Sequence, residues 1–499
     1  MDPVLTTFAL YIVGMMVIGY YFYKRNQDTE DYFLGDRGLN APVTALSAQA
    51  SDMSGWLLMG FPGAVYAGGF SAMWIGIGLA IGTYLNWQFT ASRLRYYTEI
   101  VDSITLTDFF ESRYKDDSRA LRIVTGLVIL VFFTIYVSSG LVAGGTLFET
   151  ILGVDYNIAV YISVVIIALY TYLGGYLAVS WSDFIQGSLM FIALVIVPVA
   201  VIINMGGLSE LWAQVSEVNR DLLYAFRQVD FDPGNGAAWL STGEGVSFVD
   251  WISNIGWGLG YFGMPHIIIR FMSIDKGEDL PTSQFIGVTW VVVTLIGAVF
   301  VGIIGIVTFA EPLGNPETVF LDLLQYVMHP WVGGIFLAAV LAAIMSTVDS
   351  QLLVSSSALT EDFYKAFFSR DASDRELLIV SRVSVVLITL VALYFAMAGG
   401  RILDIVGYAW AGLGSAFGPA VLFSLYWKKT NKYGVLAGIL VGGITVIVWN
   451  NFFAYTGLYE IIPGFFLSSL VIFLVSLLGP ETDPEIESEF EKVKEMARD

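Results

Sequence analysis

Long runs of apolar residues alternate with short polar connections along almost the whole chain. Runs of about 18 residues or more are long enough to cross a bilayer as α-helices, and they exceed the roughly ten-residue alternating segments of a membrane β-barrel. The pattern therefore predicts an all-α polytopic membrane protein. It predicts thirteen transmembrane helices, at residues 3–23, 41–68, 72–92, 121–148, 157–174, 182–205, 246–269, 284–309, 331–359, 377–398, 402–427, 433–453 and 458–479.

Two of these spans are interrupted by glycines and polar residues. They are the second span, 41–68, and the seventh, 246–269, which lie five spans apart. Transporters built from five-helix inverted repeats place the first helices of their repeats at this separation, with the broken helices facing each other at the membrane midplane. We therefore expect a five-plus-five inverted-repeat core, with repeats at about 41–205 and 246–427, inside one transmembrane domain covering 1–480.

The second span carries a carboxylate, Asp52, among Ser47, Ser51, Ser54 and Gly55. A charged side chain at the centre of a membrane costs about 2.5–3.5 kcal/mol on insertion scales, so it indicates a functional site. The surrounding hydroxyls and glycine favour a helix that breaks here and exposes backbone carbonyls to an ion or a substrate.

The ninth span offers a second group of oxygens. Ser346 and Thr347 lie three and four positions after Ala343, so both hydroxyls share one helix face beside the Ala343 carbonyl. With carbonyls from the broken second span they would form a five-oxygen site, and oxygen ligands suit a hard cation such as sodium. The alternative is that both hydroxyls only bond to helix carbonyls or join helices. Asp349 either lines the exit of the ion or pairs with a backbone donor.

The seventh span presents aromatic residues where it is rich in glycine. Trp257, Tyr261 and Pro265 follow one another at intervals of four, which on an α-helix is one face. Gly258 and Gly260 allow a ligand or another backbone to approach closely, and the proline frees a carbonyl one turn earlier. This face suits a small amphipathic solute, and ordinary helix packing is the alternative.

Several other residues carry weaker signals. Tyr136 is a lone aromatic residue with a polar tip, and His266 is expected to be packed and hydrogen-bonded rather than a proton relay. Asp183 opens the predicted sixth span, where an acid is ordinary helix electrostatics. Arg37 and Arg382 are expected to anchor helix ends at the membrane boundary.

Composition supports a membrane protein and excludes several kinds of chemistry and binding. The chain is 56% hydrophobic and only 14% charged, against about 25% charged residues in soluble domains. It has no cysteine, which excludes disulfides and thiolate chemistry, and its two histidines exclude a multi-histidine metal site within one chain. It has no basic patch that would indicate nucleic-acid binding. Residues 3–23 lack a basic start and a cleavage site, so we expect a retained first helix.

Charge predicts the orientation. With the N-terminus outside, all but three of the 24 lysines and arginines fall in inside segments, and the exceptions are Arg220, Arg227 and Arg401. The positive-inside rule therefore places the C-terminus in the cytoplasm, where residues 481–499 are expected to form a solvated acidic tail. The outer connections 206–245 and 310–330 have few bases and are predicted to hold short helices over an outer vestibule. Residues 230–236 are predicted to form turns.

Seven segments of the chain resemble the sodium/solute symporter family, and in particular its bacterial sodium/proline branch. The resemblance covers about residues 5–480, while the tail beyond Pro480 shows no match. Gln49 and Asp349 depart from it, because smaller uncharged residues are expected there. The segments are 44–60, 132–136, 177–183, 256–266, 341–347, 408–412 and 460–464.

The resemblance implies residue roles. It implies a sodium site on the carbonyls of Ala50 and Met53 together with Ala343, Ser346 and Thr347. It implies that Asp52 is an important acid of the second span and that Asp183 takes part in sodium coupling. The proline-binding positions that it implies are Ser54, Gly55, Trp56, Tyr136, Trp257, Tyr261 and Pro265.

The function expected from these features is secondary active transport, not enzymatic catalysis. Sodium moving inward would drive L-proline uptake by alternating access across a bacterial inner membrane, with a monomer sufficient and the oligomeric state undetermined. One charge crossing 100 mV supplies about 2.3 kcal/mol and a tenfold sodium gradient about 1.4 kcal/mol. Together they support roughly 500-fold accumulation of a neutral solute.

Three alternatives remain open at this stage. The first is a sodium symporter for another small solute, which would need only a few changes in the solute site. The second is an intramembrane enzyme that uses a serine and a histidine, although no G-x-S-x-G motif is present and Asp52 would be unexplained. The third is a channel, which would conduct without saturation.

Overall fold

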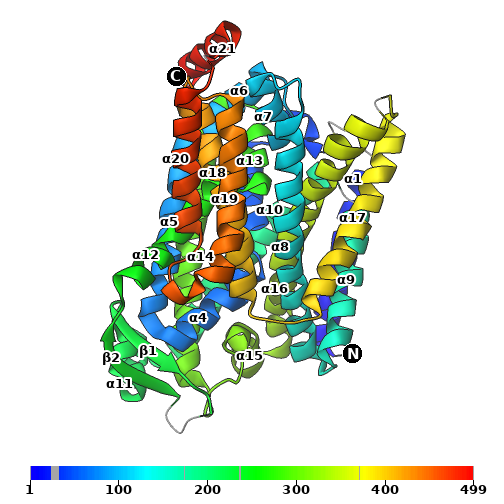
Figure 1. The fold of residues 1–499 in the computed structure, drawn as a ribbon. Coiled ribbons are helices and arrows are strands. Elements are labelled where there is room, and N and C mark those ends of the chain that lie inside the picture. Colours follow the sequence, from blue (N-terminus) through cyan, green and yellow to red (C-terminus); the bar gives the residue numbers. More distant parts are fainter. Residues whose placement is uncertain are drawn as a thin grey trace.

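The computed structural model describes residues 2–23, 33–173, 175–234, 238–369, 371–480 and 482–497. Long helices run side by side through the molecule (Figure 1). They are α1 (Pro3–Tyr23), α8 (Ala120–Leu152), α9 (Tyr156–Leu173), α10 (Tyr176–Asn204), α14 (Leu280–Thr308), α16 (Pro330–Ser357), α17 (Asp374–Ala396), α18 (Ile402–Tyr426), α19 (Lys432–Phe452) and α20 (Ile461–Leu478). In the described part of the chain, ten helical stretches are long and apolar enough to cross a membrane. The predicted polytopic helical membrane protein is therefore confirmed.

Shorter elements complete the bundle, and several continue one another without a turn. Between α1 and α8 they are η1 (Gly35–Arg37), α3 (Ala41–Asp52), η2 (Trp56–Gly60), α4 (Phe61–Gly68), η3 (Gly69–Ala72), α5 (Met73–Asn86), η4 (Trp87–Ala91), α6 (Ser92–Ile100) and α7 (Leu106–Tyr114). Between α10 and α16 they are α11 (Leu208–Val218), η5 (Arg220–Leu223), β1 (Arg227–Phe231), β2 (Trp239–Gly245), α12 (Phe248–Gly256), η6 (Trp257–Gly263), α13 (Pro265–Met272), η7 (Gly277–Asp279), η8 (Pro316–Thr318) and α15 (Val319–Val327). After α16 they are η9 (Ala358–Phe368), η10 (Ala454–Thr456) and α21 (Pro484–Met496).

Three predicted span ends are wrong because apolar runs mark only the most hydrophobic part of a helix. The third span was expected to end at 92 but continues through η4 and α6 to Ile100. The ninth was expected to end at 359 but continues through η9 to Phe368. The sixth was expected to begin at 182 but α10 begins at Tyr176, directly after the extended residue Gly175. Polar residues at these ends form helix as readily as apolar ones.

One feature contradicts the all-α prediction. Strands β1 and β2 pair antiparallel as a hairpin in the connection 206–245, beside the short helix α11. Asp230 and Phe231, expected in a turn, belong to β1, while Asn235 and Gly236 lie outside the described residues. The hairpin is fastened to the bundle because the Trp239 indole N–H donates a 2.8 Å hydrogen bond to the carbonyl of Tyr66 in α4. Two short strands of mixed polarity leave little periodic signal in a sequence.

The two termini lie at opposite ends of the bundle (Figure 1). Helices α6, α7 and α21 lie at one end, named here the α7 end. The hairpin, α11 and α15 lie at the other, named here the hairpin end. Opposite termini agree with an odd number of crossings. Lys24, Arg25, Arg370 and Arg498, which were used to predict the orientation, lie outside the described residues.

The acidic tail differs from its prediction in that part of it is ordered against the bundle. Helix α21 buries Ile486, Phe490 and Val493 and packs against α6. Lys115, which ends α7, forms an ion pair with Glu485. Apolar residues at intervals of three and four give this charged helix a face that packs, so residues 484–496 are not a fully solvated segment.

Candidate functional site

The second span is broken, as predicted. The Asn40 side chain accepts a hydrogen bond from the Val43 N–H at the start of α3, and the helix ends at Asp52. Met53 leaves the helical conformation at φ −77° and ψ 79°, and helical structure resumes after Gly55 in the π-helical turn η2. A side chain on Gly55 would meet the Ala143 Cβ at 2.8 Å, so the bend packs directly on α8.

The seventh span is broken in a different way from the one its spacing suggested. Trp257 to Gly263 form a 3-10 helix, Met264 is extended, and α13 begins at Pro265. A 3-10 helix has three residues per turn, so Trp257 and Tyr261 do not share one face. The prediction of a single Trp257–Tyr261–Pro265 stripe is therefore wrong, because it assumed a continuous α-helix.

Glycines in this segment let it lie against the backbone of α18. A side chain on Gly263 would meet the Gly418 backbone nitrogen at 2.6 Å. The Trp410 indole occupies the position that a side chain on Gly260 would need, and its N–H donates a 2.7 Å hydrogen bond to the carbonyl of Trp257. The open backbone thus serves close packing between η6 and α18.

The structure brings together the oxygens predicted to bind a cation. The Ser346 hydroxyl donates to the carbonyl of Ala50 at 2.8 Å and to that of Ala343 at 3.0 Å. The Thr347 hydroxyl donates to the Ala50 carbonyl at 3.3 Å. These groups are almost completely buried and come from α3 and α16, nearly 300 positions apart in the chain. These contacts are the ones that the alternative interpretation expects, since the hydroxyls bond to helix carbonyls and join α3 to α16. The cation site stays a prediction.

Met53 is the fifth member of the predicted set. It is fully buried at the break, and its N–H donates a 2.8 Å hydrogen bond to the Gln49 carbonyl. No cluster of three or more acidic, histidine or cysteine side chains that could hold a metal is found in the described part of the chain. The oxygens gathered at Ala50 are those of hydroxyls and carbonyls, and oxygen ligands suit a hard cation.

Asp52 links the two broken spans. The Tyr261 hydroxyl donates a 2.6 Å hydrogen bond to one carboxylate oxygen, Oδ2. The other oxygen, Oδ1, is buried without a hydrogen-bond partner among the described residues. The backbone carbonyl of Asp52 accepts a 3.0 Å hydrogen bond from the Trp56 indole N–H. A buried carboxylate with an unpaired oxygen is costly on its own, so this position favours a cation nearby.

The predicted solute residues form one group around Asp52 and two outlying positions. Ser54, Gly55 and Trp56 follow Asp52 directly, and the Ser54 hydroxyl accepts a 3.3 Å hydrogen bond from the Trp56 N–H. Tyr261 packs edge-on against Trp410, with ring centroids 5.0 Å apart.

The outlying solute positions are Trp257 and Pro265. Trp257 stacks on Tyr459 at 5.3 Å, where η6 begins. Pro265 lies beyond Met264 at the start of α13 and lines a cavity on the α7 side of the break. The structure therefore does not place all seven predicted residues in mutual contact.

Tyr136 and His266 are packed together. Their rings meet at nearly right angles, with centroids 6.1 Å apart, and Phe133 contacts the histidine ring at 5.3 Å. The Tyr136 hydroxyl and both histidine ring nitrogens have no hydrogen-bond partner among the described residues. The prediction that His266 is packed is confirmed, but the predicted hydrogen bond is not found.

Asp183 belongs to a buried polar cluster that the sequence did not predict. It lies two turns into α10 rather than at a helix start, and its Oδ2 accepts hydrogen bonds from Ser47 at 2.7 Å and Arg270 at 3.0 Å. Arg270 also donates to the Ser350 hydroxyl at 2.7 Å and to the His266 carbonyl at 2.6 Å. Both charged side chains are fully buried.

Arg270 is the residue that sequence reasoning missed. It was counted among the basic residues near the inner face, but it lies inside the bundle in contact with three other elements. The available signal was its place four residues after His266 in the apolar segment 264–272. A lone arginine in such a segment needs a buried anionic partner. The nearby Asp349 is also fully buried, and its two interpretations, a position on the ion exit or a pairing with a backbone donor, both stay predictions.

Comparisons with known proteins give one consistent result. Residues 32–442 match the sequence profile described as "Sodium:solute symporter family". A sodium/proline symporter of Escherichia coli is 47% identical over 500 residues, which covers 98% of this chain and 95% of that protein. An osmoregulated proline transporter of Bacillus subtilis is 46% identical over 483 residues, which covers 95% and 94%.

Solved structures agree on the fold. A Na⁺-coupled sialic acid symporter in a substrate-bound outward-open state superposes with a TM-score of 0.77 at 18% identity, over 96% of this chain and 99% of that one. A protein named MhsT, solved in complex with L-phenylalanine, gives a TM-score of 0.51 at 16% identity, over 88% of this chain and 98% of that one. At these identities the likeness concerns the arrangement of the helices.

Proposed function

The chain belongs to the sodium:solute symporter family, and from this premise we propose that it carries L-proline into the cell by coupling it to inward sodium movement. Family members are transporters, so the enzyme alternative is set aside. The relatives named as sodium/proline symporters match nearly the whole chain, which supports proline as the solute. The observation that carries the proposal is the bond between Tyr261 and Asp52, next to the oxygens of Ala50, Ser346 and Thr347.

The proposed architecture has thirteen crossings and two five-helix inverted repeats, at about 41–205 and 246–427. The breaks after Asp52 and at Met264 support it, because each lies in the first span of its repeat. Opposite termini support the odd count. The α7 end, which carries Arg93, Arg95, Arg113 and Arg122, is proposed to face the cytoplasm of a bacterial cell, with the N-terminus outside.

Sodium is proposed to bind between α3 and α16. Its ligands would be the carbonyls of Ala50 and Met53 together with Ala343, Ser346 and Thr347. The hydroxyls of Ser346 and Thr347 now donate to carbonyls, and each also has lone pairs that can turn toward an ion. Binding would fix the broken end of α3 against α16 and thereby set the position of Asp52.

Proline is proposed to bind beside this site. Sodium binding would order the segment after Asp52, which contains Ser54, Gly55 and Trp56. Tyr261 is hydrogen-bonded to Asp52. Ion binding would therefore bring these residues into position for the solute. Tyr136, Trp257 and Pro265 would complete it as the helices move. A solute with charged ends and an apolar ring suits this combination of open backbone and aromatic side chains.

Alternating access follows if the group of helices around α3 and α13 rocks against the group around α8 and α16. Asp183 is proposed to take part in sodium coupling through Arg270, since this pair joins α10 to α13. A symporter for another small solute differs from this proposal only in the solute. A monomer contains all the residues invoked.

Uptake by purified protein tests the proposal. Protein in sealed proteoliposomes would be given radiolabelled L-proline with an inward sodium gradient, and with a matched potassium gradient as the control. Accumulation above equilibrium with sodium alone is expected. Sodium-driven uptake of another small solute, with none of proline, would reject proline and keep the symporter. Flux that never saturates and never exceeds equilibrium would favour a channel.

A further inference from the structure

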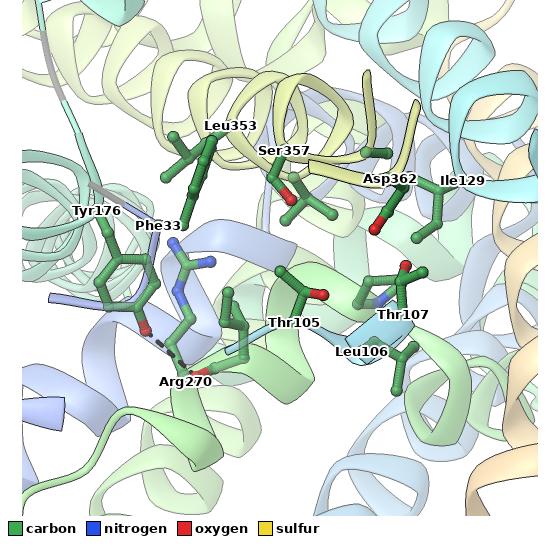
Figure 2. A pocket seen from close by; sticks show the side chains of 14 residues that line it. Phe33, Thr105, Leu106, Thr107, Ile129, Tyr176, Arg270, Leu353, Ser357 and Asp362 are labelled. Carbon is green, nitrogen blue, oxygen red and sulfur yellow. Dashed lines mark hydrogen bonds between the residues drawn. The ribbon is translucent and has the colours of Figure 1, made fainter. Parts of the chain in front are cut away.

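A narrow, partly enclosed cavity lies on the α7 side of the broken seventh span. Its volume is about 20 Å³, and it is lined by Pro265 and Arg270 of α13, Ser357 of α16, Thr107 of α7 and Asp362 of η9, among others. Figure 2 shows Arg270, Thr107, Ser357 and Asp362 around this space. Because Pro265 also belongs to the proposed solute site, the cavity adjoins that site on the side of the α7 end.

A second hollow lies next to the first and opens at the α7 end. Its volume is about 540 Å³, and most of its lining is charged or polar. Asp102, Asp108, Glu111, Arg119, Arg122, Glu361 and Lys365 line it. Consecutive residues face different hollows, since Thr107 and Asp362 line the cavity while Asp108 and Glu361 line the open recess. Neighbouring residues of α7 and of η9 therefore form the wall that separates the cavity from the open recess.

Arg122 holds this wall together. Its guanidinium donates to Asp108 at 2.5 Å, to Asp362 at 2.8 Å and to Glu111. Asp108 and Glu111 belong to α7, Asp362 belongs to η9, and Arg122 lies near the start of α8. One side chain thus ties three elements together. Its planar fork of donors is suited to holding several carboxylates at once.

The other charges facing the recess do not duplicate this role. Lys365 pairs with Glu361 within η9 at 2.8 Å, and Arg119 donates to the Ala366 carbonyl at 2.8 Å. Within the part of the chain that the structure describes, neither forms a hydrogen bond or ion pair with the acids of α7. Arg122 is therefore the described basic side chain that closes the wall across α7 and η9.

The chemistry of this wall suits a part that opens. Arg122, Asp108 and Glu111 are partly exposed and line the aqueous recess, so water can reach these two ion pairs, whereas Asp362 is buried on the cavity side. Segment η9 is π-helical over all its eleven residues, and π-helical turns are rare and frequent at functional sites. Leu353 and Ile129 supply apolar side chains to the lining of the cavity, and Ile129 lies beside Asp362 (Figure 2).

We infer that Arg122 is the latch of a gate through which the solute leaves at the α7 end. Separating its guanidinium from Asp362 and Asp108 parts η9 from α7 and joins the cavity to the open recess. Arg122 is a positioning residue, because it acts on the exit route through α7 and η9 and does not touch the proposed solute site. The direction of exit and the solute rest on the proposed function, while the latch itself does not.

The absence of cysteine from the chain makes a direct accessibility test possible. Ser357→Cys places one thiol in the lining of the cavity. Its rate of reaction with a charged methanethiosulfonate reagent is measured on purified protein in nanodiscs, without sodium or proline. Arg122→Gln in this background is expected to raise the rate about tenfold or more, which corresponds to a shift of about 1.4 kcal/mol toward the open gate.

Two controls distinguish opening of the gate from a general loosening of the fold. Lys365→Gln removes the same charge from the same recess without touching the latch, and we expect less than a twofold change in rate. Val65→Cys, a buried position on α4 at the hairpin end, should not become more reactive with Arg122→Gln. Equal labelling rates of Ser357→Cys in the Arg122→Gln and Lys365→Gln backgrounds would overturn the latch. So would an equal rise in the labelling rate of Val65→Cys caused by Arg122→Gln.

If Arg122→Gln does not yield folded protein, Asp362→Asn replaces it under the same criteria. This substitution breaks one of the three ion pairs and keeps the side-chain shape, so an increase of severalfold at Ser357→Cys is expected and no increase rejects the latch. The labelling needs no transport. A failure of proline uptake would therefore count against the proposed function alone, and unchanged labelling alongside normal uptake would count against the gate alone.

Discussion

Tyr261 and Asp52 are joined by a 2.6 Å hydrogen bond that the tyrosine hydroxyl donates to one carboxylate oxygen. Both side chains are buried, and each lies at the break of its own discontinuous helix. The bond therefore makes the position of one break depend on that of the other. An ion that orders the break in the second span would therefore also affect the conformation of the seventh span through this hydrogen bond.

The first prediction concerns this bond. Tyr261→Phe leaves both carboxylate oxygens of Asp52 without a donor, and hydrogen bonds to charged groups are worth about 1.5–3 kcal/mol. We expect proline affinity at saturating sodium to fall by about tenfold to a hundredfold, as measured by equilibrium binding. Tyr170→Phe is the control, because its buried hydroxyl donates to the neutral Ser182. An equal loss of proline affinity in both variants would show that the Tyr261 hydroxyl has only a structural role.

The second prediction concerns the proposed sodium oxygens. Ser346→Ala and Thr347→Ala each remove one hydroxyl from the cluster at Ala50, and a loss of about 1.4 kcal/mol corresponds to a tenfold change. Each should raise the sodium concentration for half-maximal uptake about tenfold and change proline affinity at saturating sodium far less. Thr389→Ala, which removes a hydroxyl that only bonds within α17, should leave sodium dependence unchanged. Unaltered sodium dependence in the first two variants would remove them from the ion site.

The third prediction concerns the buried pair Asp183–Arg270. Asp183→Asn leaves an arginine buried without its counter-charge, which typically costs about 3–5 kcal/mol. The melting temperature of the purified protein should fall strongly, and less so in Asp183→Asn/Arg270→Gln, where both charges are gone. Lys494→Gln, which breaks the exposed pair with Glu491, should have almost no effect. An additive double variant would show that the two side chains act independently.

The fourth prediction concerns pH and the connection at the hairpin end. Burial raises the pKa of the Glu317 carboxyl above its ordinary value of 4.5, although the N–H groups of Ile402 and Leu403 oppose the shift. The folded protein therefore holds this proton more tightly than the unfolded chain. The contribution of Glu317 to stability is full below pH 4.5, is lost as pH rises through the raised pKa, and then stays constant.

A comparison of unfolding against pH tests this sign. Glu317→Gln should remove that part of the pH dependence, seen as a flatter melting-temperature profile above pH 4.5. Glu311→Gln, at an exposed position of the same connection, supplies the matched loss of charge and should keep the original profile. An unchanged profile above pH 4.5, with the difference between Glu317→Gln and the parent protein found below pH 4.5, would mean that the two backbone hydrogen bonds outweigh burial.

The sequence by itself determined the membrane class and the two broken spans, and it singled out the hydroxyls of Ser346 and Thr347 that the structure places at the Ala50 carbonyl. Apolar runs report the bilayer directly, because a spanning helix must be apolar for about 20 residues. Asp52 in an apolar segment, and Ser346 with Thr347 on one helix face, are local signals of the same strength. The resemblance of several segments to one family then indicated proline and sodium.

Only the tertiary structure decided which distant groups meet. Arg270 had no partner in its own segment, and its pairing with Asp183 and Ser350 depends on how α13, α10 and α16 pack. The same holds for Arg122, whose carboxylates come from α7 and η9. The 3-10 form of η6, the hairpin and the packed face of α21 were also settled by contacts with neighbouring elements. Periodicity along one segment describes that segment alone, whereas a buried charge is placed by partners that are far away in the chain.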